Sequence, residues 1–129
     1  MPMSRFRKGF TLLELLIVVL IIGIMSAFAI PRFQNTKGKA YASSMKSDLR
    51  NVASQQEQYF TYNGTYSNDL SLISITSSQG VTITVIEANG RGWSATATHP
   101  SAYPMVCAVF YGQAVPVSPA ITEGVIRCE

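Results

Sequence analysis

The chain has 129 residues, 47% of them apolar and 13% charged, which is enough for one small domain and too little for several. Its formal net charge of +3 comes from the first nine residues, where Arg5, Arg7 and Lys8 meet no acid, because the remaining seven basic residues balance seven acids. This balance argues against a general nucleic-acid-binding surface.

An apolar run from Phe10 to Ile30 follows the basic segment. As a helix rising about 1.5 Å per residue, it is long enough to cross the ~30 Å hydrocarbon core of a membrane. The arrangement also resembles a secretory signal peptide, but the run is too long, and Ala27 and Ala29 form a weak cleavage site before Pro31. A plain membrane anchor, with the basic segment in the cytoplasm, is the simpler alternative.

A carboxylate lies inside this apolar run at Glu14. A charge there costs a few kcal/mol unless it reaches the membrane interface or finds a partner. Glu14 lies near the start of the run, so one interpretation is an incidental acid that reaches the headgroups. A plain anchor gives no reason for the residue, and acids inside membrane segments are candidate functional residues by default.

The segment KGFTLLELLIVVLIIGIMSAFAIP, residues 8–31, resembles the class III signal of type IV pilins and type II secretion pseudopilins. In that family a membrane peptidase cuts a basic leader after its final Gly, and the same enzyme N-methylates the next residue. A Glu four residues beyond that residue is the family's hallmark. Gly9, Phe10 and Glu14 match this spacing.

The resemblance implies that cleavage creates a new amine at Phe10 and that Glu14 pairs with this amine, on its own chain or on a neighbouring one. Pairing offsets much of the cost of a charge in a low-dielectric bundle. The implied role of Glu14 is therefore assembly specificity rather than catalysis. Gly23 and Pro31 fall where many pilins carry helix breakers, so a helix bend is expected there.

The segment 31–60 is amphipathic and continues the helix. Apolar residues and one Gln recur at steps of three and four, which is one stripe of a helix expected to cover a sheet. The stripe comprises Tyr41, Met45, Leu49, Val52, Gln56, Tyr59 and Phe60. Asp48 lies beside the stripe and is less easily placed.

A loop is predicted over residues 61–80, beginning at the turn signal Asn63-Gly64. The glycosylation sequon formed by residues 63–65 is interpreted as a chance match. The aromatic residues here are expected to pack in the core and loops, and four apolar residues are expected to anchor the loop. These sets are Tyr59, Phe60, Tyr62 and Tyr66, and Leu70, Leu72, Ile73 and Ile75.

Strands are predicted at residues 81–87, 93–98 and 105–111, where β-branched and small residues alternate. A hairpin turn at 88–92, a proline-containing loop at 99–104 and a short edge strand in 124–128 complete the pattern.

The resemblance implies an α+β type IV pilin fold, a long N-terminal helix packed on a small antiparallel β-sheet. Its expected parts are a leader 1–9, an apolar helix 10–30, an amphipathic half 31–60 and a head 61–129, with a loop 61–80, a sheet 81–111 and a disulfide region 107–128.

The two cysteines, Cys107 and Cys128, are interpreted as a disulfide, since a lone pair is a poor zinc site. A disulfide implies an oxidising compartment outside the cytoplasm. Pilins often have a C-terminal region closed by a disulfide, whereas major pseudopilins more often hold it with calcium. The tail offers only Glu123 and Glu129 as acids, which is too few for a calcium cage. No cofactor or metal is expected.

An enzyme is not indicated, because no catalytic set can be assembled by spacing and the single histidine, His99, is expected on a surface loop. A membrane-anchored binding domain outside the pilin system is one alternative. DNA binding by a local patch is another, although the mature chain has no net side-chain charge. That patch would comprise Arg91, Arg127, Tyr103 and Trp93.

The resemblance favours a structural subunit of a type IV pilus, made as a single-pass inner-membrane precursor and assembled with other pilins into an extracellular filament. It implies a prepilin peptidase and methyltransferase, an assembly platform and an ATPase as partners. The alternative is a minor pilin or a type II secretion pseudopilin of a short periplasmic fibre.

Overall fold

The computed structural model describes residues 9–129, with the side chains of residues 31–35 left outside the description. The chain divides into two units, Met1–Asn35 and Thr36–Glu129. One helix, α1 (Leu12–Asn63), runs through both. It is followed by the strands β1 (Thr82–Ala88), β2 (Gly92–Thr98), β3 (Val106–Gly112) and β4 (Arg127–Cys128), with the short 3₁₀ helix η1 (Pro100–Ala102) between β2 and β3. The predicted α+β architecture is confirmed.

The C-terminal end of α1 lies three residues beyond the predicted boundary at 60. The Gly64 N–H donates to the Phe60 carbonyl at 2.8 Å, and Gly64 has a φ of 69°. This left-handed glycine just past the last turn is a common way to end a helix. The Asn63 side chain also donates to the Tyr59 carbonyl at 3.0 Å. Asn63 and Gly64 therefore form the end of the helix, whereas the prediction ended it at residue 60.

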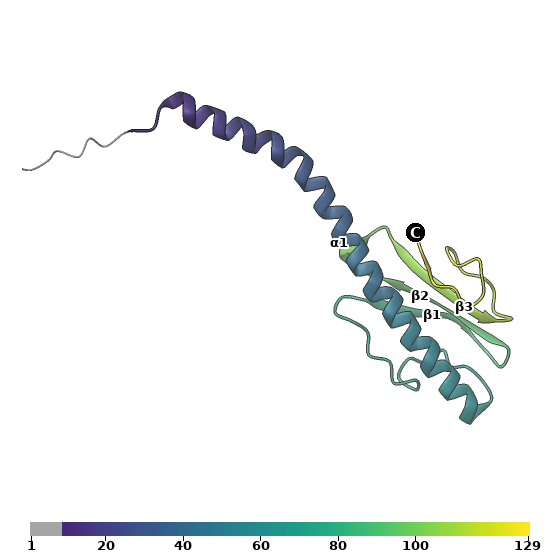
Figure 1. Cartoon of the computed structure of the whole chain (residues 1–129). Helices are drawn as coiled ribbons and strands as arrows, with labels where there is room; N and C mark the ends of the chain where they lie inside the picture. The colour runs from purple at the N-terminus through teal and green to yellow at the C-terminus, as the bar shows by residue number, and fades with distance from the viewer. Residues whose placement is uncertain (1–8) are drawn as a thin grey trace, which may run out of the picture. The chain divides into compact units, whose positions relative to one another are not determined.

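The predicted stripe of α1 packs on the sheet (Figure 1). Met45, Leu49 and Val52 are fully buried, and they share a core with the inward-facing residues of β2 and β3. Those strand residues are Trp93, Ala95, Ala97, Cys107 and Val109. The small alanines of β2 let the helix approach the sheet closely. The indole of Trp93 is also buried in this core, and it stacks on the ring of Tyr111 with ring centres 5.1 Å apart.

Two polar residues beside or within the stripe are buried because the loop after α1 satisfies them. The Gln56 amide donates to the Ser67 carbonyl at 2.6 Å and accepts from the Ser67 N–H at 2.9 Å. The Asp48 carboxylate accepts from the N–H of Ser78 at 2.7 Å and from its hydroxyl at 2.8 Å. Buried polar groups need such partners, so both residues tie the loop to the helix.

All neighbouring strands pair antiparallel, in the order β1-β2-β3-β4. In the predicted hairpin turn, the Asn89 side-chain oxygen accepts from the N–H groups of Arg91 and Gly92. The register of β1 shifts between Val85 and Glu87, which is a bulge on the outer strand. The three predicted strands are each within one residue of the observed bounds, and the short edge strand is confirmed as β4.

The other face of the sheet is covered by the chain after β3. Ala108 and Phe110 of β3 are buried against Ala120 and Val117. Two carboxylates also hold the tail: Glu87 accepts from the Val115 N–H at 3.1 Å, and Glu123 accepts from the Gly112 N–H at 2.7 Å. The irregular tail is thus a packed layer.

Three side-chain expectations in this unit were wrong. Tyr62 is 81% exposed, although it was expected to pack, and Leu72 is exposed while its neighbour Ile73 is buried. His99 was expected on the surface but is buried, because its ring stacks on Tyr41 with ring centres 3.9 Å apart. Its Nδ1 accepts from the Ser101 N–H at 3.0 Å, which caps η1.

Candidate processing and assembly site

The predicted cleavage position lies in non-helical chain just before α1. Gly9 and Phe10 are both exposed, and the exposed fraction of Phe10 is 79%. An additional carbon at Gly9 would meet nothing within 4 Å. Exposed segments outside regular structure are the preferred sites of proteolytic cutting. Residues 1–8, including Arg5, Arg7 and Lys8, lie outside the described residues.

Thr11 and Glu14 form a reciprocal cap at the start of α1. The Thr11 N–H and hydroxyl both donate to Glu14 Oε2, each at 3.0 Å. The Glu14 N–H donates to the Thr11 hydroxyl oxygen at 3.2 Å. This arrangement is the capping box, in which a Thr at the N-cap and a Glu three residues later satisfy two otherwise unpaired N–H groups. Its signature, Thr-x-x-Glu, is present in the sequence, and the prediction overlooked it.

The cap gives Glu14 a local function in addition to the predicted pairing with an amine. A carboxylate that accepts two hydrogen bonds within its own chain is less costly in an apolar setting than one without partners. Both bonds end on Oε2, and in the described part of the chain Oε1 has no hydrogen bond. This oxygen can therefore accept from a cation. Glu14 lies three residues after the N-cap Thr11, and Phe10 directly precedes Thr11.

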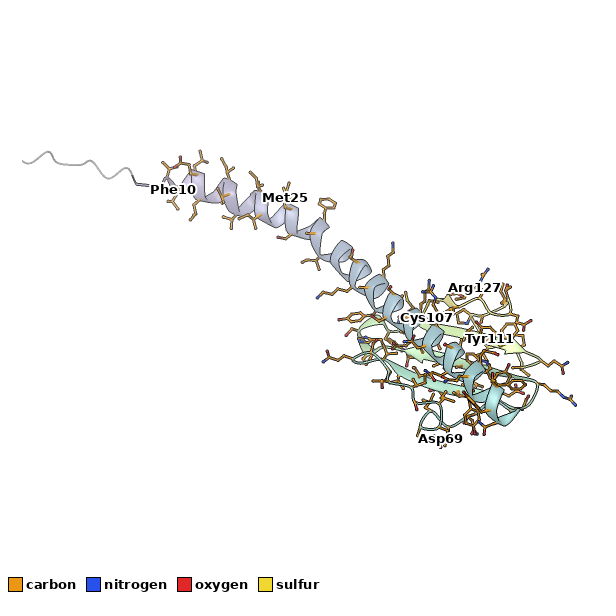
Figure 2. The ribbon with its side chains drawn as sticks, turned by 60° about the horizontal axis from the view of Figure 1, so that its bottom comes forward. Phe10, Met25, Asp69, Cys107, Tyr111 and Arg127 are labelled. Atoms are coloured by element: carbon orange, nitrogen blue, oxygen red, sulfur yellow. A yellow bond between two sulfur atoms is a disulfide. The ribbon has the colours of Figure 1, made fainter. Side chains whose placement is uncertain are left out.

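The first half of α1 contains a segment long and apolar enough to cross a membrane, Leu12–Ile30. Its 19 residues are all exposed, as the side chains around labelled Met25 illustrate (Figure 2). The polar side chain of Ser26 donates to the Ile22 carbonyl at 2.7 Å, so its hydroxyl needs no external partner in an apolar environment.

The helix bend expected at Gly23 and Pro31 remains a prediction. α1 is helical through both Gly23 and Pro31, so neither residue ends it. An added carbon at Gly23 would meet nothing within 4 Å, so this glycine is not required by packing within the chain. The side chain of Pro31 lies outside the described residues.

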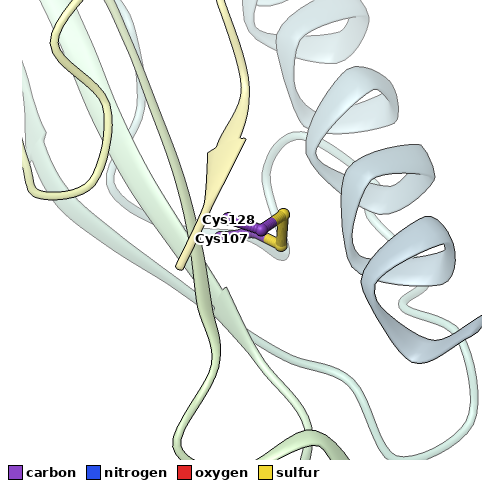
Figure 3. Close-up of a disulfide and its surroundings, with 2 residues drawn as sticks. All are labelled: Cys107 and Cys128. Atoms are coloured by element: carbon purple, nitrogen blue, oxygen red, sulfur yellow. A yellow bond between two sulfur atoms is a disulfide. The ribbon is translucent and has the colours of Figure 1, made fainter. Parts of the chain in front are cut away.

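Cys107 and Cys128 form the predicted disulfide (Figure 3). The two residues are directly opposite each other on β3 and β4, with Cα atoms 4.0 Å apart. Both sulfurs point to the side of the sheet on which α1 lies, and Cys107 is fully buried in the core. The bond closes the tail that covers the other face, because it joins the last strand to β3.

One of the four residues predicted to form a DNA-binding patch, Trp93, is not on the surface. Trp93 is fully buried, so its ring cannot stack on a base. Arg91, Arg127 and Tyr103 are exposed. Among residues 9–129, no group of three or more His, Cys, Asp or Glu side chains is arranged to hold a metal ion.

Comparison with known proteins supports the reading of the N-terminus. Residues 4–30 match the model of the prokaryotic N-terminal methylation motif. The chain is 34% identical over 99 residues to the type IV wide pilus major component PilA4 of Thermus thermophilus, covering 74% of this chain and 76% of that protein.

Two further relatives match over shorter stretches. The type IV major pilin protein PilA of Myxococcus xanthus is 41% identical over 71 residues, which are 53% of this chain and 32% of that protein. The type II secretion system core protein G of Dickeya chrysanthemi is 34% identical over 64 residues, 50% of this chain and 42% of that protein. These relatives are fibre or secretion components and not enzymes, in agreement with the prediction. With its methylation motif, its helix-on-sheet fold and its extended match to the Thermus pilus component, the chain belongs to the type IV pilin family.

Proposed function

We propose that this chain is the structural subunit of a type IV pilus. The observation that carries the proposal is the segment Leu12–Ile30, in which every side chain is exposed. An apolar surface of this size needs a partner that the chain itself does not provide. The partner is the lipid bilayer before assembly and the equivalent helices of neighbouring subunits in the filament.

The precursor is oriented by its basic leader, which stays in the cytoplasm while the head lies outside. The disulfide between Cys107 and Cys128 supports this orientation, since such bonds persist in oxidising compartments. A prepilin peptidase in the inner membrane cuts between Gly9 and Phe10 and methylates the new amine of Phe10. A membrane platform and a cytoplasmic ATPase then drive assembly.

Glu14 sets the register of assembly in this proposal. Its Oε2 holds the helix cap with Thr11, and its Oε1 takes the charged amine of Phe10, either in the same chain or in a neighbour. A charge without a partner in a bundle of apolar helices is strongly unfavourable. Subunits therefore add in the position that brings amine and carboxylate together.

A pseudopilin of a short periplasmic fibre is the second candidate, because the type II secretion protein G of Dickeya chrysanthemi matches half of this chain. The tail argues for the pilus: it is held by a disulfide and by the contacts of Glu87 and Glu123 with backbone N–H groups. Glu123 is engaged in this way and contributes to no acidic cluster in the described chain that would hold calcium.

Mass spectrometry of filaments sheared from the cell surface tests the proposal. The expected result is an abundant peptide that begins with N-methylated Phe10. Finding the same processed form in membranes but not in the sheared material would instead support the periplasmic fibre. Finding Gly9 still joined to Phe10 in both fractions would contradict both candidates.

A further inference from the structure

A groove lies on the head between the last turns of α1 and the chain that follows, and it has no part in the assembly proposed above. It has a volume of about 220 Å³. One wall is formed by Gln55, Gln58, Tyr59 and Tyr62 of α1. Their spacing of three and four residues places them on one side of the helix. The other wall is the segment from Leu72 to Ser74.

This groove is held in shape by contacts at several points along the loop. Gln56 is buried and makes two hydrogen bonds to the backbone of Ser67. Ile73 is 2% exposed and anchors the middle of the loop in the core. The Asp48 carboxylate binds Ser78 farther along. A loop fixed in this way loses little conformational freedom when a ligand binds, which favours affinity.

The residues that line the groove combine aromatic rings with amides and include no charged side chain. Tyr62 is 81% exposed and offers a broad ring face. Gln55 and Gln58 make no side-chain hydrogen bond to any other described residue, so each amide can both donate and accept. A face of an aromatic ring attracts the slightly positive C–H groups of a ligand. Amides pair with hydroxyl groups, and the absence of charge gives no advantage to phosphate or carboxylate.

Ser74 adds an independent observation at the rim. Its φ is 49°, in the left-handed region that a residue other than glycine rarely adopts. Such backbone geometry persists only where the surroundings enforce it, and it occurs often at binding sites. Here Ser74 follows directly after the buried anchor Ile73, and both residues line the groove.

We propose that this groove binds a neutral sugar ring, with one face of the sugar on Tyr62 and its hydroxyl groups paired with Gln55 and Gln58. Pockets that enclose drug-sized ligands have volumes of about 300–1,000 Å³, and this groove is smaller. The groove therefore takes one ring at its surface, with an affinity on the order of millimolar. This gives the head a recognition function that goes beyond its function in assembly.

The test is a titration of the ¹⁵N-labelled full chain in phosphocholine micelles, because glycoside detergents would compete for the groove. The probes are methyl β-galactoside, methyl β-glucoside, methyl α-mannoside and N-acetylglucosamine, with N-acetylneuraminic acid as the anionic comparison. At least one neutral sugar is expected to cause saturable shifts in the amide resonances of residues 55–63 and 72–74.

Two variants locate the binding. Tyr62→Ala is expected to weaken it roughly tenfold, the loss that corresponds to one aromatic contact. Tyr103→Ala is the matched control, since Tyr103 is 85% exposed but lies outside the groove, and it should change the affinity less than about twofold. Gln58→Ala, at another exposed position, should weaken binding several-fold.

Two results would overturn the proposal. One is the absence of saturable shifts with any of the neutral sugars. The other is tighter binding of N-acetylneuraminic acid than of every neutral sugar. If the shifts are absent and Tyr62→Ala also lowers filament yield, the groove is instead a contact between subunits. The shear experiment is independent of both results, so failure here leaves the function as a pilus subunit intact.

Discussion

The two halves of α1 differ in where their apolar residues find partners. In the second half, Met45, Leu49 and Val52 are fully buried against the strands of the same chain. In the first half, every residue of Leu12–Ile30 is exposed. The second half therefore contributes to the core of the subunit, and the first half presents an apolar surface to its surroundings. One helix can do both because its residue pattern changes from uniformly apolar to amphipathic.

Substitutions of Glu14 should have the largest effect, and they separate its two interactions. Glu14→Gln can keep the cap with Thr11, since Gln also serves at this position of a capping box, but it loses the charge. Glu14→Val loses both. We expect both variants to insert and be cleaved, and both to reduce sheared filament yield more than tenfold. Thr11→Ala is the control, because it removes the hydroxyl contacts and costs about 1 kcal/mol of helix stability but keeps the charge. Normal filament yield from Glu14→Gln would show that the cap, and not the ion pair, is the contribution of Glu14.

A matched pair of leucine truncations tests the comparison between the two halves. Leu49→Ala should lower the free energy of unfolding of the head by about 2–5 kcal/mol, because it leaves a cavity in the core. Leu20→Ala, at a position that is 63% exposed, should change that energy by less than about 0.5 kcal/mol and should lower filament yield instead. Denaturant unfolding in micelles and quantification of sheared filaments give both values. Equal losses of head stability in the two variants would contradict the division.

Removal of the disulfide should be the next largest effect. Replacing Cys107 and Cys128 together by Ser should cost roughly 3 kcal/mol in the chain-entropy account of a loop of this length. The loss should concentrate on the tail, because the bond fixes β4 to β3. Compared with the unmodified chain, hydrogen exchange in the variant should accelerate more for residues 113–128 than for α1. Uniformly faster exchange over the whole head would indicate that the bond supports the core rather than the tail.

The buried carboxylate of Asp48 should contribute less. Asp48→Ala leaves the Ser78 N–H without its acceptor and should cost about 1–3 kcal/mol of unfolding free energy. Ser78→Ala removes only the hydroxyl contact at 2.8 Å and should cost about 1 kcal/mol. Thermal unfolding of the two variants measures the difference. A larger loss for Ser78→Ala than for Asp48→Ala would contradict the assignment of Asp48 as the residue that fixes the loop.

Tyr66 gives the smallest predicted effect, a decline in stability at high pH. Burial first, and then the hydrogen bond and charge of Glu57, raise the pKa of Tyr66 in the folded state above its usual value. The unfolded chain therefore loses the proton first as the pH rises. The stabilising contribution is complete below about pH 10 and is lost as the pH rises through the folded-state pKa. Tyr66→Phe should remove this part of the decline, which unfolding curves between pH 8 and 11 would detect. An unchanged pH dependence in that variant would contradict the assignment.

The sequence predicted the elements that depend on local periodicity. The stripe of α1 and the strands were recognisable because their apolar residues repeat at 3.6 and 2 positions. It failed where exposure is decided by distant contacts. Trp93 and His99 each stack on an aromatic ring that is distant in the chain, Tyr111 and Tyr41. Both are buried, and the sequence does not show these contacts.

The candidate sites were predictable to different degrees. The Gly9, Phe10 and Glu14 spacing is contained within a few residues, so the sequence displayed it directly, and the Thr11 cap was equally visible as Thr-x-x-Glu. The groove beside Tyr62 was not predictable, because it requires the last turns of α1 and the loop at Ser74 to lie together.

A helical reconstruction of the sheared filament by cryo-electron microscopy tests the central claim most directly. We predict that Leu12–Ile30 of each subunit is buried among the same segments of its neighbours, with the Phe10 amine within ion-pair distance of a Glu14 carboxylate. A filament in which this segment remains exposed at the surface, or in which Glu14 faces no amine, would contradict the account.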